Sequence, residues 1–431
     1  MKNPTIRLDV PASPEFFHVA RAMTEKSSTA LGLGPKEAMR VGMATEEIFM
    51  YLCRTSPGQE LSIRSSLAGS GVNVEFGFSA RHFPLHSFNL TSRVDISDEQ
   101  GLDEVGLLIA SRMVDRFSVE TGGDDKITLI LTKEKNYEKA KADSRERPKP
   151  SDSFTVRYPE PEEAFFLAES VAAVYPPEEV PRVFAHPGML ADMLRHGQSC
   201  ALIAVSQGGE ILGGIEWEWT AGAKTAQCLG PYILTEEADS ALCEGLLNGC
   251  LESLAKLPVL GLLNRRPNHD LPVHYFELIG ELPITGLDGA LRSIPHYFRQ
   301  MHEDPGSSVW ADERLEPFLK EEYGLLALPR KILKSGLTES HAAQPSVLFA
   351  KIDRSRKTAT LWPVSRGKDV RENLAAHIAA LGPESTGGVY FSLDLGRPWQ
   401  AEWISPVMDA GFVPRLVMPY AGHGDIVLFS P

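Results

Sequence analysis

Three cations gather in one short turn of the sequence. Arg366, Lys368 and Arg371 surround Gly367 at the predicted start of a helix. Backbone N–H groups at a helix N-terminus, together with cationic side chains, favour an anion such as a phosphate. Arg366, Gly367 and Lys368 are therefore candidate residues for binding an anionic cofactor. A solvated basic turn with Asp369 as the helix cap explains the same residues at least as well.

Carboxylates alternate with tryptophans in a predicted strand that reads Glu216, Trp217, Glu218, Trp219. Successive side chains of a strand point to opposite faces, so the two carboxylates share one face. A general base could stand here, although a half-buried strand gives the same alternation without catalysis. Candidates for a proton donor are His274, Tyr275 and Tyr420.

No metal site is predicted. The twelve histidines show no metal-ligand spacing, and the five cysteines contain no C-x-x-C pair. An odd number of cysteines favours buried or bystander thiols in a reducing cytoplasm over a disulfide framework. These cysteines are Cys53, Cys200, Cys228, Cys243 and Cys250.

Length and composition exclude several classes of protein. The chain has 431 residues, 43% of them hydrophobic and 23% charged, which is typical of a globular protein with two or three domains. The net charge of −14 argues against general nucleic-acid binding. No apolar run reaches the roughly 20 residues that span a bilayer, and the N-terminus lacks the apolar core of a signal peptide. We therefore expect a cytoplasmic protein without membrane or nucleic-acid partners.

A charged segment divides the chain. Residues 133–150 are almost purely charged and end in prolines, as is typical of a solvated linker. We expect one domain over residues 1–135, a linker over 136–152, and further folded units over 153–330 and 331–431.

The first domain is predicted to place helices on one face of a mixed sheet. Turn and capping signals predict helices over about 13–31, 34–55 and 103–114, and strands over 61–65, 72–78 and 126–132. After the linker, the pattern predicts a strand, helices, a hairpin over 200–219, a strand, a helix over about 236–257, another strand, and a short helix at 274–280. A weak repeat follows: a hairpin over 347–364, a helix over 370–381, a strand over 388–393 and a short helix ending at 408–412.

The helix that contains Met43 to Arg54, within this order of elements, resembles the ATP-binding domain of the bacterial anti-sigma-factor serine kinases, in the GHKL group of ATPases. In that family a Glu of the second helix orients or deprotonates the nucleophile, and an Asn four residues later holds magnesium. The resemblance implies Glu46 as the catalytic residue. The position of the Asn is Met50, whose thioether is a poor ligand for a hard cation.

The two other nucleotide boxes of that family also differ here. The loop over residues 79–86 has no carboxylate to accept the adenine amino group. The Gly-x-Gly-Leu turn that holds phosphate at a helix start keeps only Gly106, preceded by Glu104. Gly106 is thus the remaining candidate for ATP binding, and the resemblance implies a degenerate site for ATP and Mg²⁺.

The region after the linker resembles the GNAT acyltransferases, and the weak repeat resembles a second, shortened unit of the same fold. The aromatic residues at 274–280 and the Ala410-Gly411-Phe412 run carry the resemblance. The family holds the coenzyme A pyrophosphate at a helix N-terminus, so acetyl-CoA is an implied cofactor. The turn over residues 234–240 of the first unit has three carboxylates and no glycine, which leaves the turn at Arg366 as the better candidate.

Two functional hypotheses follow for an α/β protein with a GHKL-type sandwich and tandem GNAT-like units. The leading hypothesis is a bacterial regulatory protein of the anti-sigma-factor kinase type, with a degenerate nucleotide site, that docks a sigma factor or its antagonist. The alternative is a GNAT-type N-acyltransferase that uses acyl-CoA and is regulated by the N-terminal domain. The resemblance also implies a homodimer.

Overall fold

The computed structural model divides the chain into two compact units. Unit 1 comprises residues 1–136 and 343–348, and unit 2 comprises residues 137–342 and 349–431. The structure describes residues 4–79, 83–91, 99–121, 126–141, 147–151, 153–219, 222–236, 240–286, 288–334, 345–353, 356–382 and 385–431. The predicted first domain ends one residue from the division at Asn136, whereas the regions predicted over 153–330 and 331–431 lie mostly in one unit.

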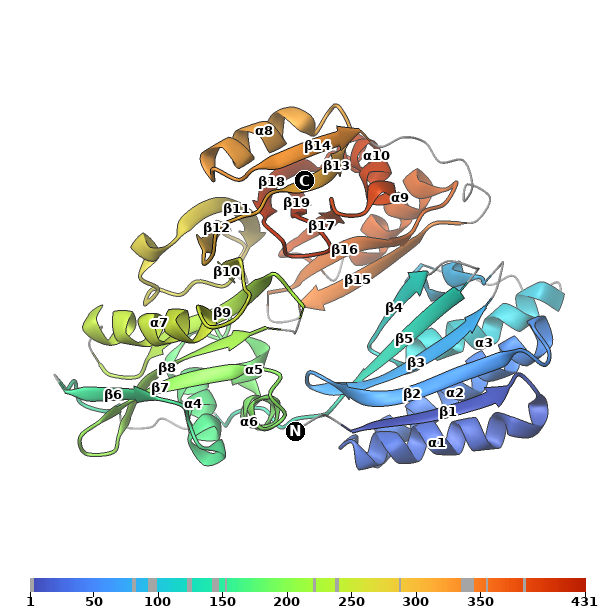
Figure 1. The fold of residues 1–431 in the computed structure, drawn as a ribbon, viewed down its shortest axis with the longest axis horizontal. Helices are drawn as coiled ribbons and strands as arrows, with labels where there is room; N and C mark the ends of the chain where they lie inside the picture. The colour runs from blue at the N-terminus through green and yellow to red at the C-terminus, as the bar shows by residue number, and fades with distance from the viewer. Residues whose placement is uncertain are drawn as a thin grey trace. The chain divides into compact units, whose positions relative to one another are not determined.

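Unit 1 is a five-stranded antiparallel sheet with three long helices. Its sheet has the order β1-β2-β3-β5-β4. The elements are β1 (Thr5–Pro11), α1 (Phe17–Ala30), α2 (Pro35–Thr55), β2 (Glu60–Ala68), β3 (Gly71–Ser79), α3 (Glu99–Met113), β4 (Arg116–Thr121) and β5 (Lys126–Glu134). Buried and half-buried residues alternate along β3, and the helices cover the buried face, as Figure 1 shows. The prediction of an α/β protein is confirmed.

Local details of unit 1 differ from the sequence prediction. Strands β1 and β4 were not predicted, and α3 begins at Glu99 instead of about Asp103. A short segment from far along the chain also belongs to this unit. The side-chain amide of Asn89 donates to the carbonyl of Ser346 (2.9 Å) and accepts the backbone N–H of Leu348 (2.8 Å). These two hydrogen bonds fix the backbone of residues 346–348 to Asn89.

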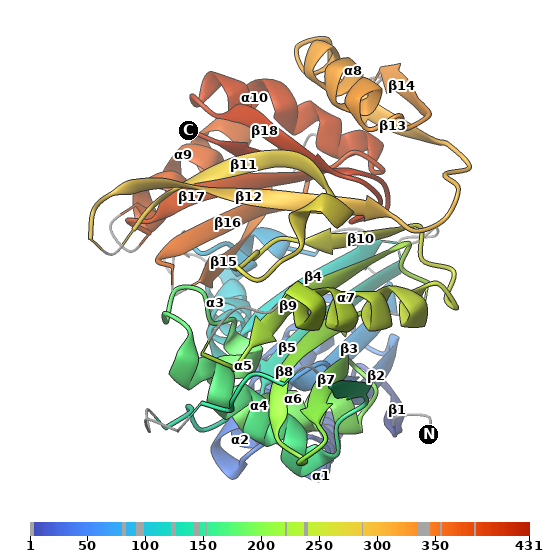
Figure 2. The ribbon, with the colours of Figure 1, turned by 90° about the vertical axis from the view of Figure 1, so that its left-hand side faces the viewer.

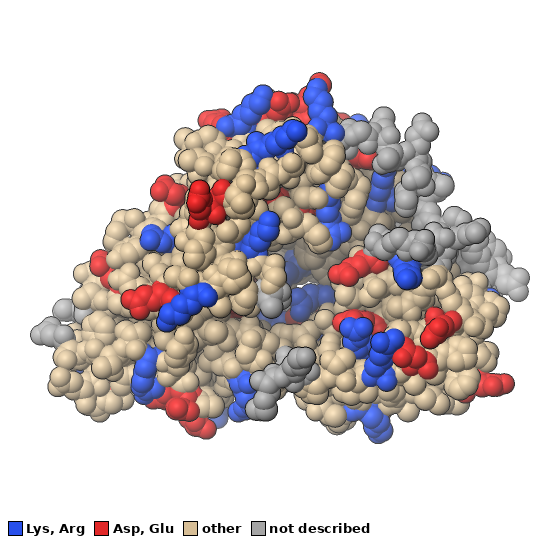
Figure 3. All heavy atoms as spheres, in the orientation of Figure 1, with Lys and Arg blue, Asp and Glu red and all other residues tan. Residues whose placement is uncertain are grey.

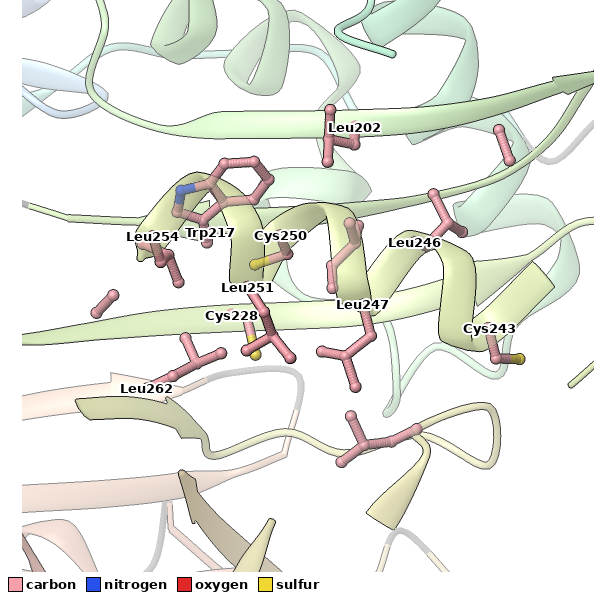
Figure 4. Close-up of a cluster of buried hydrophobic side chains, with 14 of the residues drawn as sticks. Leu202, Trp217, Cys228, Cys243, Leu246, Leu247, Cys250, Leu251, Leu254 and Leu262 are labelled. Carbon is pink, nitrogen blue, oxygen red and sulfur yellow. The ribbon is translucent and has the colours of Figure 1, made fainter. Parts of the chain in front are cut away.

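The first half of unit 2 is a seven-stranded sheet with the order β11-β12-β10-β9-β8-β7-β6. Its elements are β6 (Phe154–Arg157), α4 (Pro161–Val174), α5 (Arg182–Ala185), α6 (Pro187–Arg195), β7 (Cys200–Ser206), β8 (Ile211–Glu218), β9 (Thr225–Ile233), α7 (Ser240–Leu254), β10 (Gly261–Asn264), β11 (Glu277–Thr285) and β12 (Leu291–Gln300). Helix α7 packs its apolar side on this sheet, where Leu246, Leu247, Cys250 and Leu254 share one core with Trp217 (Figure 4).

The second half of unit 2 repeats the central part of the first. Its elements are β13 (Ser307–Ala311), α8 (Glu316–Leu325), β14 (Arg330–Lys334), β15 (Val347–Asp353), β16 (Thr358–Ser365), α9 (Val370–Leu381), β17 (Gly388–Asp394), α10 (Ile404–Asp409), β18 (Val413–Met418) and β19 (Ile426–Ser430). The order β15-β16-β17-β19-β18 matches β8-β9-β10-β12-β11 of the first half strand for strand. The second sheet therefore has the connectivity of the first without its initial strands and helices.

The short helix predicted at 274–280 is wrong. A single 3-10 turn covers Val273–Tyr275, and strand β11 begins at Glu277. The strand forms because β12 pairs with it over its whole length and because Ile279, Leu282 and Ile284 are buried. Sequence periodicity alone did not distinguish this strand from a helix.

The two halves of unit 2 pack through β11 and β18 (Figure 2). A shared core contains side chains of both sheets: Leu263, Ile279, Leu282 and Phe298 from the first, and Tyr390, Leu416, Met418 and Leu428 from the second. Gly280 lies at a bulge in β11 with a φ of 129°, and a Cβ there would meet the carbonyl oxygen of Arg415 at 2.5 Å. Glycine at this position permits the close approach of the two sheets.

Replacing Gly280 with Ala is expected to lower the free energy of unfolding of unit 2 by about 2 to 4 kcal/mol, because the new Cβ meets backbone and the residue keeps a positive φ. Gly411→Ala is the matched control: its φ is also positive (91°), but a Cβ there meets nothing within 4 Å. The control should lose only about 1 kcal/mol. Tryptophan fluorescence during urea unfolding reports unit 2 alone, since all six tryptophans belong to it. Equal losses in the two variants would contradict the packing argument.

Candidate functional site

The parallel strands β9 and β10 pair briefly and then part. Their ladder has three residue pairs, from Gly261 opposite Thr225 to Leu263 opposite Gln227. Strand β10 ends at Asn264, whereas β9 continues to Ile233. Beyond the ladder, the edge of β9 presents backbone groups that β10 does not pair.

Side chains of the segment after β10, together with Tyr175, form hydrogen bonds with the backbone groups of that edge. The Asn264 amide donates to the carbonyl of Gly230 (3.2 Å), and the Asn268 amide donates to the carbonyl of Pro231 (2.7 Å). The Ile233 N–H donates to the hydroxyl of Tyr175 (2.6 Å), which in turn donates to the carboxylate of Asp270. The gap between the strands is therefore bridged by this chain's own side chains.

Tyr175 also brings two reactive side chains together. Its ring lies edge-on to the ring of Tyr232 at 5.0 Å and stacks on the imidazole of His269 at 5.4 Å. His269 stands between two carboxylates, with Nε2 at 3.5 Å from Asp270 and Nδ1 at 3.9 Å from Glu179. The phenol of Tyr232 and the imidazole of His269 therefore both contact the ring of Tyr175. A phenol and an imidazole flanked by carboxylates are groups suited to proton transfer.

Several polar atoms around the parting strands have no hydrogen-bond partner among the described residues. They include the hydroxyl of Tyr232, Nε of Arg265 and Oδ1 of Asn268. Tyr232 is fully buried, and burial raises the pKa of its hydroxyl above the usual value, so the hydroxyl is protonated at neutral pH. Buried polar groups normally find partners, so a concentration of unpaired ones marks a place where a ligand would supply them.

A cluster of half-buried cations lies near Tyr232. Arg265 and Arg266 directly follow β10, and Arg356 precedes β16 in the second half. Arg266 pairs with Asp353. Burial and the neighbouring Arg356 lower the pKa of Arg266 to about 10. Burial and the charge of Arg265 lower the pKa of His296 to about 3. We refer to Arg265, Arg266 and Arg356 as the arginine cluster.

Glu216 on β8 is a further buried group of the first half without a hydrogen-bond partner among the described residues. Its side chain is fully buried, and neither carboxylate oxygen has a hydrogen-bond partner among the described residues. Burial, assisted by the charge of Glu218, raises the pKa of Glu216 well above 4.5. Strand β8 is buried on both faces, so Glu216 is as enclosed as Trp217, and Glu218 is exposed because it ends the strand. Burial therefore favours the uncharged form of the Glu216 carboxyl.

The predicted catalytic residue Glu46 faces another helix. Its carboxylate accepts from the guanidinium of Arg21 on α1 at 2.7 Å. The neighbouring Glu47, not Glu46, lies against Gly106: a Cβ at Gly106 would meet Glu47 Oε2 at 2.6 Å. Gly106 lies in the interior of α3, where its N–H belongs to the helix, instead of at the predicted helix start. The adenine-box residues Ala80, Arg81 and His82 lie outside the described residues.

The predicted anion site at Arg366, Gly367 and Lys368 precedes α9 as expected. Arg366 forms an ion pair with Glu402 (2.9 Å), and Arg371 forms one with Asp409 (2.7 Å). Lys368 is exposed. An incoming anion would therefore compete with Glu402 for Arg366. The binding role of this turn stays a prediction.

The predicted proton donors lie apart from the parting strands. The Tyr420 hydroxyl donates to Asp304 (2.5 Å), in a buried network where Arg330 pairs with both Asp304 and Asp425. His274 is exposed, and Tyr275 adjoins it in the short turn before β11. Sequence reasoning missed Tyr232, His269 and the arginine cluster. The signal available was two arginines directly after an apolar strand.

The cysteines, the possible metal ligands, the helix lengths and the surface charge complete the description of the described residues. All five cysteines are free, and four of them are buried. Among the described residues, no group of three or more His, Cys, Asp or Glu could hold a metal ion. The helices that the structure describes include none long and apolar enough to cross a membrane. On the face drawn in Figure 3, basic and acidic side chains are interspersed.

Comparison with solved structures finds GNAT acetyltransferases over about a third of the chain. An aminoglycoside 6'-acetyltransferase type Ii is 14% identical, with 35% of this chain and 99% of that chain covered and a TM-score of 0.29. A ribosomal-protein-S5-alanine acetyltransferase from Vibrio fischeri is 14% identical over 36% and 96% of the two chains, with a TM-score of 0.29. An aminoglycoside 6'-N-acetyltransferase complexed with coenzyme A is 13% identical over 35% and 99%, with a TM-score of 0.28. No protein-family model and no curated protein matches. The comparisons give no support to the anti-sigma-factor kinase hypothesis.

Glu216→Gln is expected to change the pH dependence of stability. The unfolded carboxyl has a pKa near 4.5, and the folded one has a higher pKa. The stabilising contribution of the proton is thus complete below pH 4.5 and is lost as the pH rises toward the folded pKa, by up to about 1.4 kcal/mol per pH unit. The variant should lack this decline in urea unfolding between pH 5 and 8. Glu218→Gln is the control and should follow the wild type. A wild-type slope in Glu216→Gln would show that Glu216 is ionised in the folded protein.

Proposed function

We propose that unit 2 transfers an acyl group from an acyl-CoA thioester to an amine at the end of β9. The observation that carries the proposal is the hydroxyl of Tyr232, which is buried, protonated and without a partner where β9 and β10 part. The connectivity of the sheet, which resembles that of the GNAT acyltransferases, supports the same reaction class.

The reaction requires two proton movements. The amine nitrogen attacks the thioester carbonyl and loses a proton, and the carbon–sulfur bond then breaks to release a thiolate. His269 is placed to take the proton of the amine, because its imidazole is exposed on one side and flanked by Asp270 and Glu179 on the other. Such carboxylates stabilise the imidazolium that forms.

Tyr232 is placed to give its proton to the departing sulfur. The products of that step are a thiol and a phenolate, and Arg266 and Arg356 supply positive charge to the phenolate. The proton taken by His269 restores the phenol, so the cycle ends with amide, free thiol and an unchanged protein. Burial keeps Tyr232 protonated until the thiolate appears.

Tyr232→Phe is expected to lower the rate of thiol release from acetyl-CoA at least about 100-fold, because it removes the proton donor and keeps the ring. The measurement is colorimetric detection of free coenzyme A with a panel of amines, including polyamines, aminoglycosides and amino acids. Tyr158→Phe is the control, since Tyr158 is an exposed tyrosine of the same unit. The proposal fails if the full-length protein releases no thiol with any amine, or if Tyr232→Phe keeps wild-type turnover.

The bridged edge of β9 gives a separate prediction about the donor. The amide-bearing arm of coenzyme A could pair with the Pro231 carbonyl only by displacing the Asn268 side chain. Asn268→Ala should therefore bind acetyl-CoA several-fold more tightly than the wild type by isothermal titration. Asn248→Ala on the exposed side of α7 is the control. Weaker binding by Asn268→Ala would place the arm elsewhere and make Asn268 a direct contact.

A further inference from the structure

The arginine cluster carries more positive charge than the protein compensates. Three guanidinium groups, from Arg265, Arg266 and Arg356, come together from the two halves of unit 2 and repel one another. One carboxylate, that of Asp353, pairs with Arg266 and also accepts the backbone N–H of Arg356 (3.3 Å). The side chain of Arg356 donates from Nε to the backbone carbonyl of Glu178 (3.2 Å). Two positive charges thus lack an ion-pair partner among the described residues.

Arg265 is the least compensated of the three. It forms no hydrogen bond and no ion pair with any described residue, and its Nε atom is shielded from solvent. Burial lowers the pKa of Arg265 without an opposing carboxylate. An arginine stays charged at every physiological pH, so the fold holds a half-buried cation without a counter-charge among the described residues.

The neighbours of Arg265 do not supply that counter-charge. His296 is uncharged at neutral pH because its pKa lies near 3. Tyr232 is a neutral phenol. Glu178 and Glu179 attract Arg356 from a distance, and Glu179 already lies beside His269. The missing partner of Arg265 must therefore come from outside the described chain.

We propose that the arginine cluster binds a small molecule carrying two negative charges on oxygen, provided by one phosphate or by two carboxylates. Guanidinium groups present paired N–H donors whose geometry matches the oxygens of either group. Two uncompensated cations match a dianion better than a monoanion. The adjacent hydroxyl of Tyr232 can add a donor.

Dianion binding is an activity separate from acyl transfer, and it also indicates the class of amine acceptor. Where it rests on the proposed function, the dianion belongs to the amine acceptor and positions its nitrogen near His269. Binding of the anion itself requires no transfer. Anion binding without turnover would leave this inference intact and reject the proposed function, and turnover without anion binding would do the reverse.

The proposal is tested by titrating the full chain with inorganic phosphate, succinate and acetate at constant ionic strength. Binding is measured by tryptophan fluorescence and by calorimetry. Phosphate or succinate should bind saturably, and acetate more weakly. Arg265→Gln should weaken dianion binding at least about tenfold. Arg292→Gln removes the same charge from an exposed surface pair of unit 2 and should change nothing. Saturation by phosphate alone assigns a phosphate group, and saturation by succinate alone assigns a dicarboxylate.

A second measurement does not need a ligand. Removing an uncompensated, half-buried charge should raise the urea midpoint of unliganded Arg265→Gln above that of the wild type. Arg265→Lys keeps the charge but loses the forked donors, so it should bind dianions less well without the gain in stability. The proposal is overturned if no dianion binds saturably, if Arg265→Gln binds as tightly as the wild type, or if Arg265→Gln is less stable without ligand.

Discussion

The parting of two parallel strands is the constraint on which the architecture of unit 2 depends. Strands β9 and β10 share only three residue pairs, so everything beyond Gln227 on β9 needs partners other than β10. A buried strand edge cannot remain unpaired, because each lost backbone hydrogen bond costs about 1–3 kcal/mol. The segment from Asn264 to Asp270 supplies those partners, and its course carries Arg265, Arg266 and His269 to the end of β9.

The second half meets the same constraint with fewer residues. Strands β16 and β17 pair from Thr358 to Leu361 and then part, and Gln400 bridges them by accepting the Asp394 N–H (2.7 Å) and donating to the Pro363 carbonyl (3.3 Å). The same topology therefore has its strand gap bridged by different side chains in the two halves. Ionisable side chains lie at the gap between β9 and β10, whereas the neutral amide of Gln400 bridges β16 and β17. Chemistry at a parting of strands is accordingly better supported in the first half.

The sequence predicted elements well where local signals agree with the tertiary pairing. Helix α9 has the predicted bounds, and β15, β16 and β17 lie within one residue of the strands predicted there, because turns with Gly or charged residues interrupt clear apolar runs. Strand β11 was missed because its identity depends on pairing with β12. The site was missed for the same reason: Tyr232, His269 and Arg356 are distant in sequence, and only packing of the two halves brings them together.

Paired and unpaired charges distinguish the structural ion pairs of this chain from the site proposed at the end of β9. The side chain of Arg330 is fully buried and forms ion pairs with Asp304 and Asp425. This network therefore has a structural role, because it links elements of the second half. Glu46 with Arg21, and Arg366 with Glu402, are likewise complete as pairs. Tyr232 is fully buried and Arg265 is half-buried, and neither the Tyr232 hydroxyl nor Nε of Arg265 has a partner among the described residues. The motif residues Glu46 and Arg366 are thus paired with opposite charges. Arg265 and Tyr232, near the end of β9, lack such partners among the described residues, and a ligand that supplies them would bind there.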